Sequence, residues 1–149
     1  QLLGERFPAG AGKNLPGLGI LDLYTEYKAG RFTGNAVISC SLWDPPRNLA
    51  GFENHTGLTF LGPSVKPLGK VIKGYGNNGQ DRTEGAVYKN VIGSYLHGSL
   101  LPKNPWLTDY LLAQALAYRR REFHPASLND ELEIKAHQEA SRLALRNRE

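Results

Sequence analysis

The chain has no methionine, a single cysteine and no long hydrophobic run. One cysteine, Cys40, excludes an internal disulfide framework and a cysteine-rich zinc site. No stretch approaches the roughly 20 consecutive apolar residues that cross a membrane. No basic segment followed by an apolar stretch opens the chain, as it would in a secretory signal. We therefore expect a cytoplasmic location.

The missing methionine, together with the opening QLLG (1–4), predicts a fragment whose beginning lies elsewhere. The composition is otherwise that of a globular protein, with 149 residues, 40% of them hydrophobic and 21% charged. This length is enough to bury one core. Because no internal boundary or repeat is visible, we predict one domain over residues 1–149.

The net charge is +4, and several arginines cluster near the end of the chain. These are Arg119, Arg120, Arg121, Arg142, Arg146 and Arg148. A basic helix could contact nucleic acid or an acidic partner. No aromatic residues are interspersed with these arginines to stack on bases, as single-strand binding requires. Solvated helix faces are the preferred interpretation, and we expect no nucleic acid partner.

The residue pattern predicts strands first and helices afterwards. Strands are predicted at 34–40, 49–55, 86–88 and 91–96, turns at 44–48 and 74–79, an irregular loop at 5–19, and helices at 107–118 and 128–146. The last two strands surround Lys89-Asn90 and predict a hairpin. Apolar residues at helical spacing mark the two helices. The order fits an α/β layered domain, with part of a parallel sheet left uncovered.

His97 is the strongest candidate for chemistry. It ends the apolar run 91–96 and precedes Gly98, so it lies at the end of a strand, where sites form in open α/β sheets. Histidine titrates near neutral pH and can serve as a general base. A structural histidine that bonds a loop would fit the same pattern. His124 and His137 are predicted to be loop and helix-surface residues.

Other candidate groups are weaker. His55 also ends a strand, but no metal-ligand spacing accompanies it, and we predict no metal site. Cys40 lacks a glycine elbow and is predicted to be a small half-buried residue. The glycine-rich segments 10–13 and 74–79 lack the spacing of a phosphate-binding loop, which argues against nucleotide binding.

Four segments together resemble a known family. They are GLGILD (17–22), GFENHTG (51–57), GYGNN (74–78) and GSYLHG (93–98). They resemble the glutaminase subunits (GatD) of lipid II isoglutaminyl synthases, within the cobyric-acid-synthase-like (CobB/CobQ-type) class I glutamine amidotransferases. The resemblance implies a flavodoxin-like three-layer α/β fold, of which this chain would be the C-terminal portion.

The resemblance also implies an activity. Glutamine would be hydrolysed to glutamate and ammonia through a cysteinyl thioester. The ammonia would pass to a Mur-ligase-like partner (MurT), which uses ATP to amidate the D-glutamate of lipid II to D-isoglutamine in peptidoglycan biosynthesis. We expect no cofactor in this subunit.

Residue by residue, the resemblance makes His97 the catalytic histidine. It makes Arg31 a substrate-binding residue, whose guanidinium suits the α-carboxylate of glutamine. Gln1 matches the last residue of the family's Cys-Gly-Gly-Tyr-Gln elbow, so the nucleophile would precede residue 1 and this chain alone would be inactive. Ser99 stands where better-known triad enzymes have a glutamate. The third catalytic group would then be absent or come from the partner.

Two other functions remain open. One is a cobyric acid synthase-type amidotransferase of cobalamin biosynthesis, which a fused ATP-binding domain upstream would favour. The other is a non-catalytic α/β module that binds a partner through its basic helices.

Overall fold

The structure is a computed structural model that describes residues 1–9, 13–119, 126 and 128–146. Predictions that involve residues 10–12, Arg120, Arg121, His124 or Arg148 lie outside this described part. Within it, the strands come first and the helices follow, which confirms the predicted order of this α/β chain. The elements are β1 (Arg6–Pro8), β2 (Asn14–Pro16), β3 (Leu23–Cys40), β4 (Arg47–Leu61), β5 (Gly69–Lys73), β6 (Thr83–Glu84), β7 (Ala86–Tyr88), β8 (Val91–Gly93), β9 (Leu96–His97), α1 (Pro105–Tyr118) and α2 (Glu131–Arg146).

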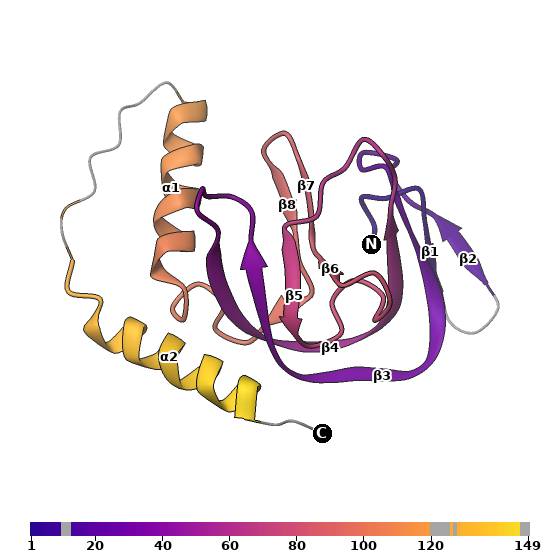
Figure 1. Cartoon of the computed structure of the whole chain (residues 1–149). Coiled ribbons are helices and arrows are strands. Elements are labelled where there is room, and N and C mark those ends of the chain that lie inside the picture. Colours follow the sequence, from indigo (N-terminus) through magenta and orange to yellow (C-terminus); the bar gives the residue numbers. More distant parts are fainter. Residues whose placement is uncertain (10–12, 120–125, 127, 147–149) are drawn as a thin grey trace.

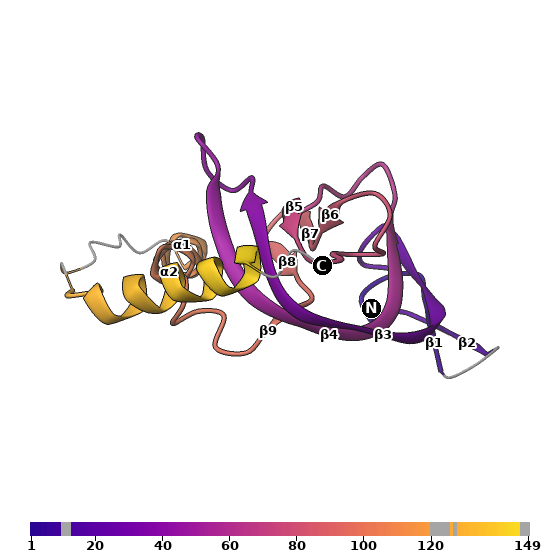
Figure 2. The same ribbon diagram turned by 60° about the horizontal axis from the view of Figure 1, so that its bottom comes forward.

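The dominant feature is a long antiparallel ribbon of β3 and β4 that curves around β5 to β8 (Figures 1 and 2). The predicted strands 34–40 and 49–55 lie inside these two elements. Both strands are longer than predicted, because polar β-branched residues continue the pairing beyond the predicted ranges. Thr25 and Thr59 are paired across the ribbon, and their hydroxyls are 2.8 Å apart in a buried hydrogen bond.

The strand order of the main sheet is β6-β5-β3-β4-β9, and every pairing in it is antiparallel. The expectation of a parallel sheet is therefore wrong for the described part of the chain. Two hairpins flank the sheet. The β7–β8 hairpin is the predicted one, with Lys89 at φ 53° in its turn. The β1–β2 hairpin lies where the sequence predicts a loop (5–19), and its short strands carry too little periodicity to be recognised.

The two faces of the ribbon have different neighbours. The inner face carries an apolar core, made of Ala36, Ile38, Cys40, Leu49, Leu68, Val71, Leu96 and Leu107. The outer face carries Val37 and Ala50, which α2 covers with Ala140 and Ala144. The helices lie at one end of the ribbon and the β1–β2 hairpin at the other (Figure 1). Among the described residues, no helix is long and apolar enough to span a membrane.

Asn104, just before α1, joins three parts of the fold. It occupies the N-cap position of α1, yet its side chain makes no capping bond. Its amide instead donates to the carbonyls of Ala50 (2.9 Å) and Leu100 (2.6 Å), and its oxygen accepts from the Ala50 N–H (2.9 Å). His137 Nδ1 of α2 lies 3.1 Å from the same oxygen and 3.0 Å from the Lys103 carbonyl. One buried amide thus fastens the segment after His97 to β4 and to α2.

His137 is therefore not the surface residue that the sequence predicts. It is half-buried, and burial lowers the pKa of its imidazole. Its ring also meets Trp106 edge-on, with 4.6 Å between ring centroids.

We expect Asn104→Ala to lower the free energy of unfolding of the full-length protein by about 2–4 kcal/mol, because it leaves the buried N–H and carbonyl of Ala50 without partners. Urea denaturation followed by circular dichroism measures the loss. Asn48→Ala is the matched control, since Asn48 is an exposed asparagine of β4. If Asn104→Ala lowers the free energy of unfolding no more than the control does, Asn104 does not fasten these segments together.

Candidate functional site

His97 lies in the two-residue strand β9 at one edge of the sheet. It pairs with Phe52 of β4, and paired residues of neighbouring strands share a face. Phe52 follows Ala50 by two residues, so His97 lies on the outer face of the sheet. Its side chain is exposed, and Gly98 follows at φ 67°. The predicted strand-end position of this histidine is confirmed.

Arg31 reaches the same face by an interruption of the ribbon. Pairing between β3 and β4 breaks between Tyr27 and Phe32, and Gly30 at φ 85° turns the chain there. Such bulges redirect side chains and are frequent beside active sites. The Arg31 Nη1 donates to Asn54 Oδ1 at 2.8 Å. A single bond to Asn54 leaves further guanidinium N–H groups available.

Asn54 connects the two candidate residues. It lies two residues beyond Phe52 on β4, which is about 7 Å along a strand. Because side chains alternate along a strand, those of Phe52 and Asn54 both point outward. Glu53, between them, and His55, which follows Asn54, are buried on the inner face. The structure therefore brings His97 and Arg31 to one exposed face, with Asn54 between them. Asn54 is a site residue that sequence alone does not indicate, although it lies in the distinctive 51–57 block.

A cavity of about 320 Å³ adjoins this face beside β3. Thr33 and Asn35 line it, and they lie on β3 just beyond Arg31. Lys73, Tyr75 and Ala144 form further parts of its wall. The carboxyl group of Glu53 also lines the cavity, so acidic, basic and neutral polar groups together surround a space close to the candidate site.

His55, the second strand-end histidine, lies on the opposite face. It is buried, its Nδ1 is 2.9 Å from the Gly57 carbonyl oxygen, and its ring stacks on Tyr95 with 3.7 Å between centroids. It therefore does not combine with His97 in a metal site. In the parts of the chain that the structure describes, no group of three or more His, Cys, Asp or Glu side chains is arranged to hold a metal ion.

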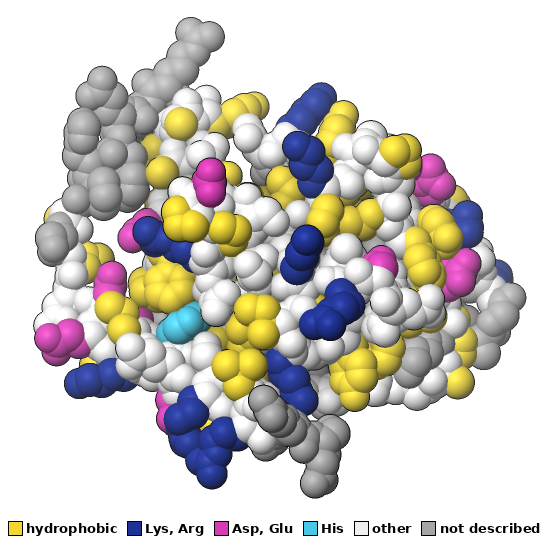
Figure 3. All heavy atoms as spheres, viewed as in Figure 1, with side chains coloured by type: hydrophobic (Ala, Val, Ile, Leu, Met, Phe, Trp, Pro, Cys, Tyr) yellow, Lys and Arg dark blue, Asp and Glu magenta, His cyan; other side chains and the backbone are white. Residues whose placement is uncertain are grey.

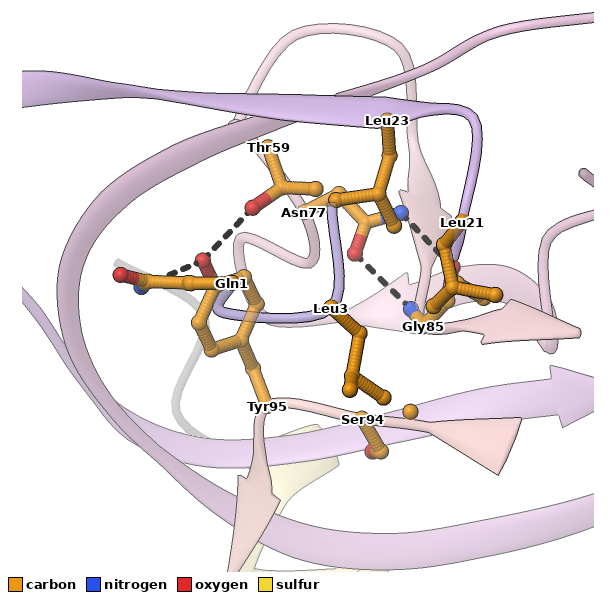
Figure 4. A pocket seen from close by; sticks show the side chains of 11 residues that line it. Gln1, Leu3, Leu21, Leu23, Thr59, Asn77, Gly85, Ser94 and Tyr95 are labelled. Carbon is orange, nitrogen blue, oxygen red and sulfur yellow. Dashed lines mark hydrogen bonds between the residues drawn. The ribbon is translucent and has the colours of Figure 1, made fainter. Parts of the chain in front are cut away.

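Tyr95, two residues before His97, lines a small pocket of about 90 Å³ (Figure 4). Its hydroxyl accepts a bond from Gln1 Nε2 (2.8 Å) and lies 2.7 Å from the Thr59 hydroxyl. Burial raises the pKa of this phenol. The segment that leads into β9 is thus fixed through both the ring and the hydroxyl of Tyr95.

Two buried carboxylates lie below the sheet, and neither is evident from the sequence. Glu53 accepts bonds from the N–H groups of Tyr75 and Gly76, both at 2.7 Å. Glu84 bonds the Ser94 hydroxyl and the Tyr95 N–H. Burial raises the pKa of both carboxyls, and their hydrogen bonds oppose the shift. The glycine-rich loop 74–79 therefore binds a carboxylate of its own chain.

Cys40 is fully buried in the inner-face core, more deeply than the half-buried position predicted for it. Burial raises the pKa of its thiol, which disfavours the reactive thiolate. It lies on the face opposite His97 and is not paired with that histidine as a nucleophile.

Basic side chains do not form one stripe on the face seen in Figure 3, where Lys and Arg are dispersed among hydrophobic groups. A nucleic-acid site would gather them on one face or along one helix. Arg142 of α2 also bonds Glu139 at 2.8 Å through its Nε. This agrees with the interpretation of the basic helix as a solvated face.

Comparison with known proteins gives a consistent picture. Residues 1–105 match the model of the CobB/CobQ-like glutamine amidotransferase domain. The chain is 46% identical over 138 residues to the lipid II isoglutaminyl synthase (glutamine-hydrolyzing) subunit GatD of Staphylococcus aureus (strain N315), covering 93% of this chain and 55% of that protein. It is 44% identical to the subunit of the same name from Streptococcus pneumoniae (strain ATCC BAA-255 / R6), over 78% of this chain and 44% of that protein.

A more distant relative is the probable cobyric acid synthase of Methanothermobacter thermautotrophicus, 36% identical over 66% of this chain and 21% of that protein. The chain spans about half the length of the two GatD subunits. Since the family model covers well over half of its residues, the chain belongs to the CobB/CobQ-like glutamine amidotransferase family.

Proposed function

We propose that this chain is part of a glutaminase subunit that hydrolyses glutamine and supplies ammonia to a synthase. The observation that carries the proposal is the shared outer face of His97 and Arg31, joined through Asn54. A base and a carboxylate-binding cation side by side suit an amino-acid substrate. The similarity to subunits named as glutamine-hydrolyzing supports the same activity.

In the proposed reaction, His97 takes the proton from a cysteine thiol, and the thiolate attacks the carboxamide carbon of glutamine. The tetrahedral intermediate collapses to a thioester as ammonia leaves with a proton from the imidazolium. Water, deprotonated by the same imidazole, then hydrolyses the thioester to glutamate and restores the thiol. Because Cys40 is buried on the other face, the thiol belongs to a part of the whole protein outside this chain.

Arg31 would hold the substrate by its α-carboxylate, through paired N–H groups of its planar guanidinium. Asn54 holds that guanidinium through the 2.8 Å bond that its Oδ1 accepts from Nη1. A held arginine loses less side-chain freedom when substrate binds, which favours affinity.

The ammonia acceptor that we propose is a Mur-ligase-like partner (MurT) that amidates the D-glutamate of lipid II with ATP, in the cytoplasm. The name of the Staphylococcus aureus relative, a lipid II isoglutaminyl synthase subunit, supports this choice. The exposed Ser99, at φ 54°, offers no carboxylate to orient His97, so we place the third catalytic group on the partner. This subunit would need no cofactor of its own.

A cobyric acid synthase-type amidotransferase is the second candidate, and the 36% identity to the Methanothermobacter protein favours it. The higher identity and wider coverage of the GatD subunits favour peptidoglycan amidation. The two candidates share the glutaminase step and differ in what accepts the ammonia.

His97→Ala in the full-length protein, assayed with its synthase partner, should lower kcat for glutamine hydrolysis by about 10²–10⁴-fold, the usual contribution of general acid–base catalysis. Coupled detection of glutamate measures the rate. Gln80→Ala, at another exposed position, is the control and should keep the parental rate. Unchanged hydrolysis in His97→Ala would instead support a non-catalytic module.

Arg31→Lys should raise KM for glutamine by about 10–100-fold, because lysine cannot form the paired hydrogen bonds of a guanidinium. Asn54→Ala should raise KM in the same direction by a smaller factor, with little change in kcat. Steady-state kinetics of both variants test the pair. Asn48→Ala removes an exposed asparagine from the same strand and should leave KM unchanged. If all these variants have the KM of the parental protein, Arg31 does not bind the substrate.

A further inference from the structure

Glu84 lies at the opposite edge of the sheet from His97. β6, which carries Glu84, forms one edge, and β9, which carries His97, forms the other. Between them the chain makes the β7–β8 hairpin, so Glu84 and Ser94 stand on either side of the hairpin base. Glu84 is fully buried there.

The carboxylate of Glu84 binds the segment that leads into β9. Its Oε1 accepts the Ser94 hydroxyl at 2.7 Å and the Tyr95 N–H at 2.8 Å. The Ser94 hydroxyl oxygen in turn accepts the N–H of Leu96, the first residue of β9, at 3.0 Å. A continuous chain of hydrogen bonds therefore runs from Glu84 to the residue before His97.

β9 needs this support because its own pairing is short. Only Leu96 and His97 pair with β4, opposite Glu53 and Phe52. Leu96 also packs against Gly51, where a Cβ would come within 2.9 Å of the leucine Cβ. On its other side, β9 has no neighbouring strand in the described sheet.

We propose that Glu84 is a positioning residue for His97, acting through Ser94 and the Tyr95 N–H to hold β9 in register with β4. The proposal rests on the function proposed above. Glu84 touches neither His97 nor the outer face, so its effect passes through the backbone of residues 94–96. Both donors use one oxygen, Oε1, and Oε2 has no hydrogen-bond partner among the described residues.

This geometry predicts which replacement preserves function. A glutamine at position 84 keeps the volume and one acceptor oxygen, so it can still receive both bonds. An alanine removes the acceptor. Ser94→Ala removes only the link from the carboxylate to the Leu96 N–H, at an exposed residue whose loss spares the core.

The test uses the full-length protein with its synthase partner and measures glutamine hydrolysis. Glu84→Ala and Ser94→Ala should lower kcat by about 10–100-fold, the cost of a base displaced by an ångström or so. KM for glutamine should stay unchanged, because Arg31 lies elsewhere on the face. Glu84→Gln should keep most of the parental kcat. The matched control, Ser64→Ala, removes a hydroxyl that binds Asp22 and makes no bond to residues 94–97, so it should have no effect on kcat.

Amide hydrogen exchange of the peptide that contains residues 94–98 gives an independent readout. Exchange there should rise in Glu84→Ala and Ser94→Ala and stay near the parental level in Glu84→Gln. If Glu84→Ala fails to fold, Ser94→Ala decides the question. Loss of thermal stability with unchanged kcat in the folded variants would reduce Glu84 to a structural residue and overturn the proposal.

His97→Ala, measured beside these variants, separates the two hypotheses. An active His97→Ala protein overturns the proposed function itself. An inactive His97→Ala protein with fully active Ser94→Ala and Glu84→Ala overturns the positioning role alone.

Discussion

The register between β3 and β4 is the constraint on which the rest of the structure depends. Side chains alternate between the faces of a strand, so a slip of one residue would exchange the two faces completely. In the observed register, Asn54 faces outward beside Arg31, and Glu53 and His55 face inward. A slipped register would place the Glu53 carboxylate outside and the apolar Phe52 inside. The proposed site exists only because this register is fixed.

Buried polar groups help to fix it. The inner face changes along the ribbon from an apolar core at one end to a polar network at the other, with Thr25, Thr59 and Tyr95 joined through their hydroxyls. An unpaired buried polar group is costly, so a network of matched donors and acceptors disfavours every register in which the matches are lost. Glu53 adds to this selection by binding the N–H groups of the loop 74–79.

The sequence predicts the parts of the fold that local periodicity controls. The two helices, the β7–β8 hairpin, the C-terminal part of β3 and the first part of β4 are all found, and His97 lies at a strand end as expected. The buried contacts of Glu84, Glu53 and Asn104 are not predictable from the sequence, because a charged or amide side chain in a short polar segment gives no sign of the partners that bury it. In the 51–57 block, Glu53 alternates with glycines and a histidine, a pattern that in hindsight marks an inward-facing carboxylate in a strand. The antiparallel pairing was missed for a related reason, since pairing direction depends on contacts between distant residues.

The edge position of His97 explains why a distant carboxylate matters to it. A base must be exposed to reach a substrate, and the edge of the outer face, beyond the part that α2 covers, provides that exposure. The same position leaves β9 with one neighbouring strand and two paired residues, so strand pairing alone gives the imidazole little rigidity. Proton transfer is sensitive to displacements of about an ångström, which makes that rigidity a functional requirement. The buried Glu84, with Ser94 as its link, supplies from beneath the sheet the constraint that a second neighbouring strand would otherwise give.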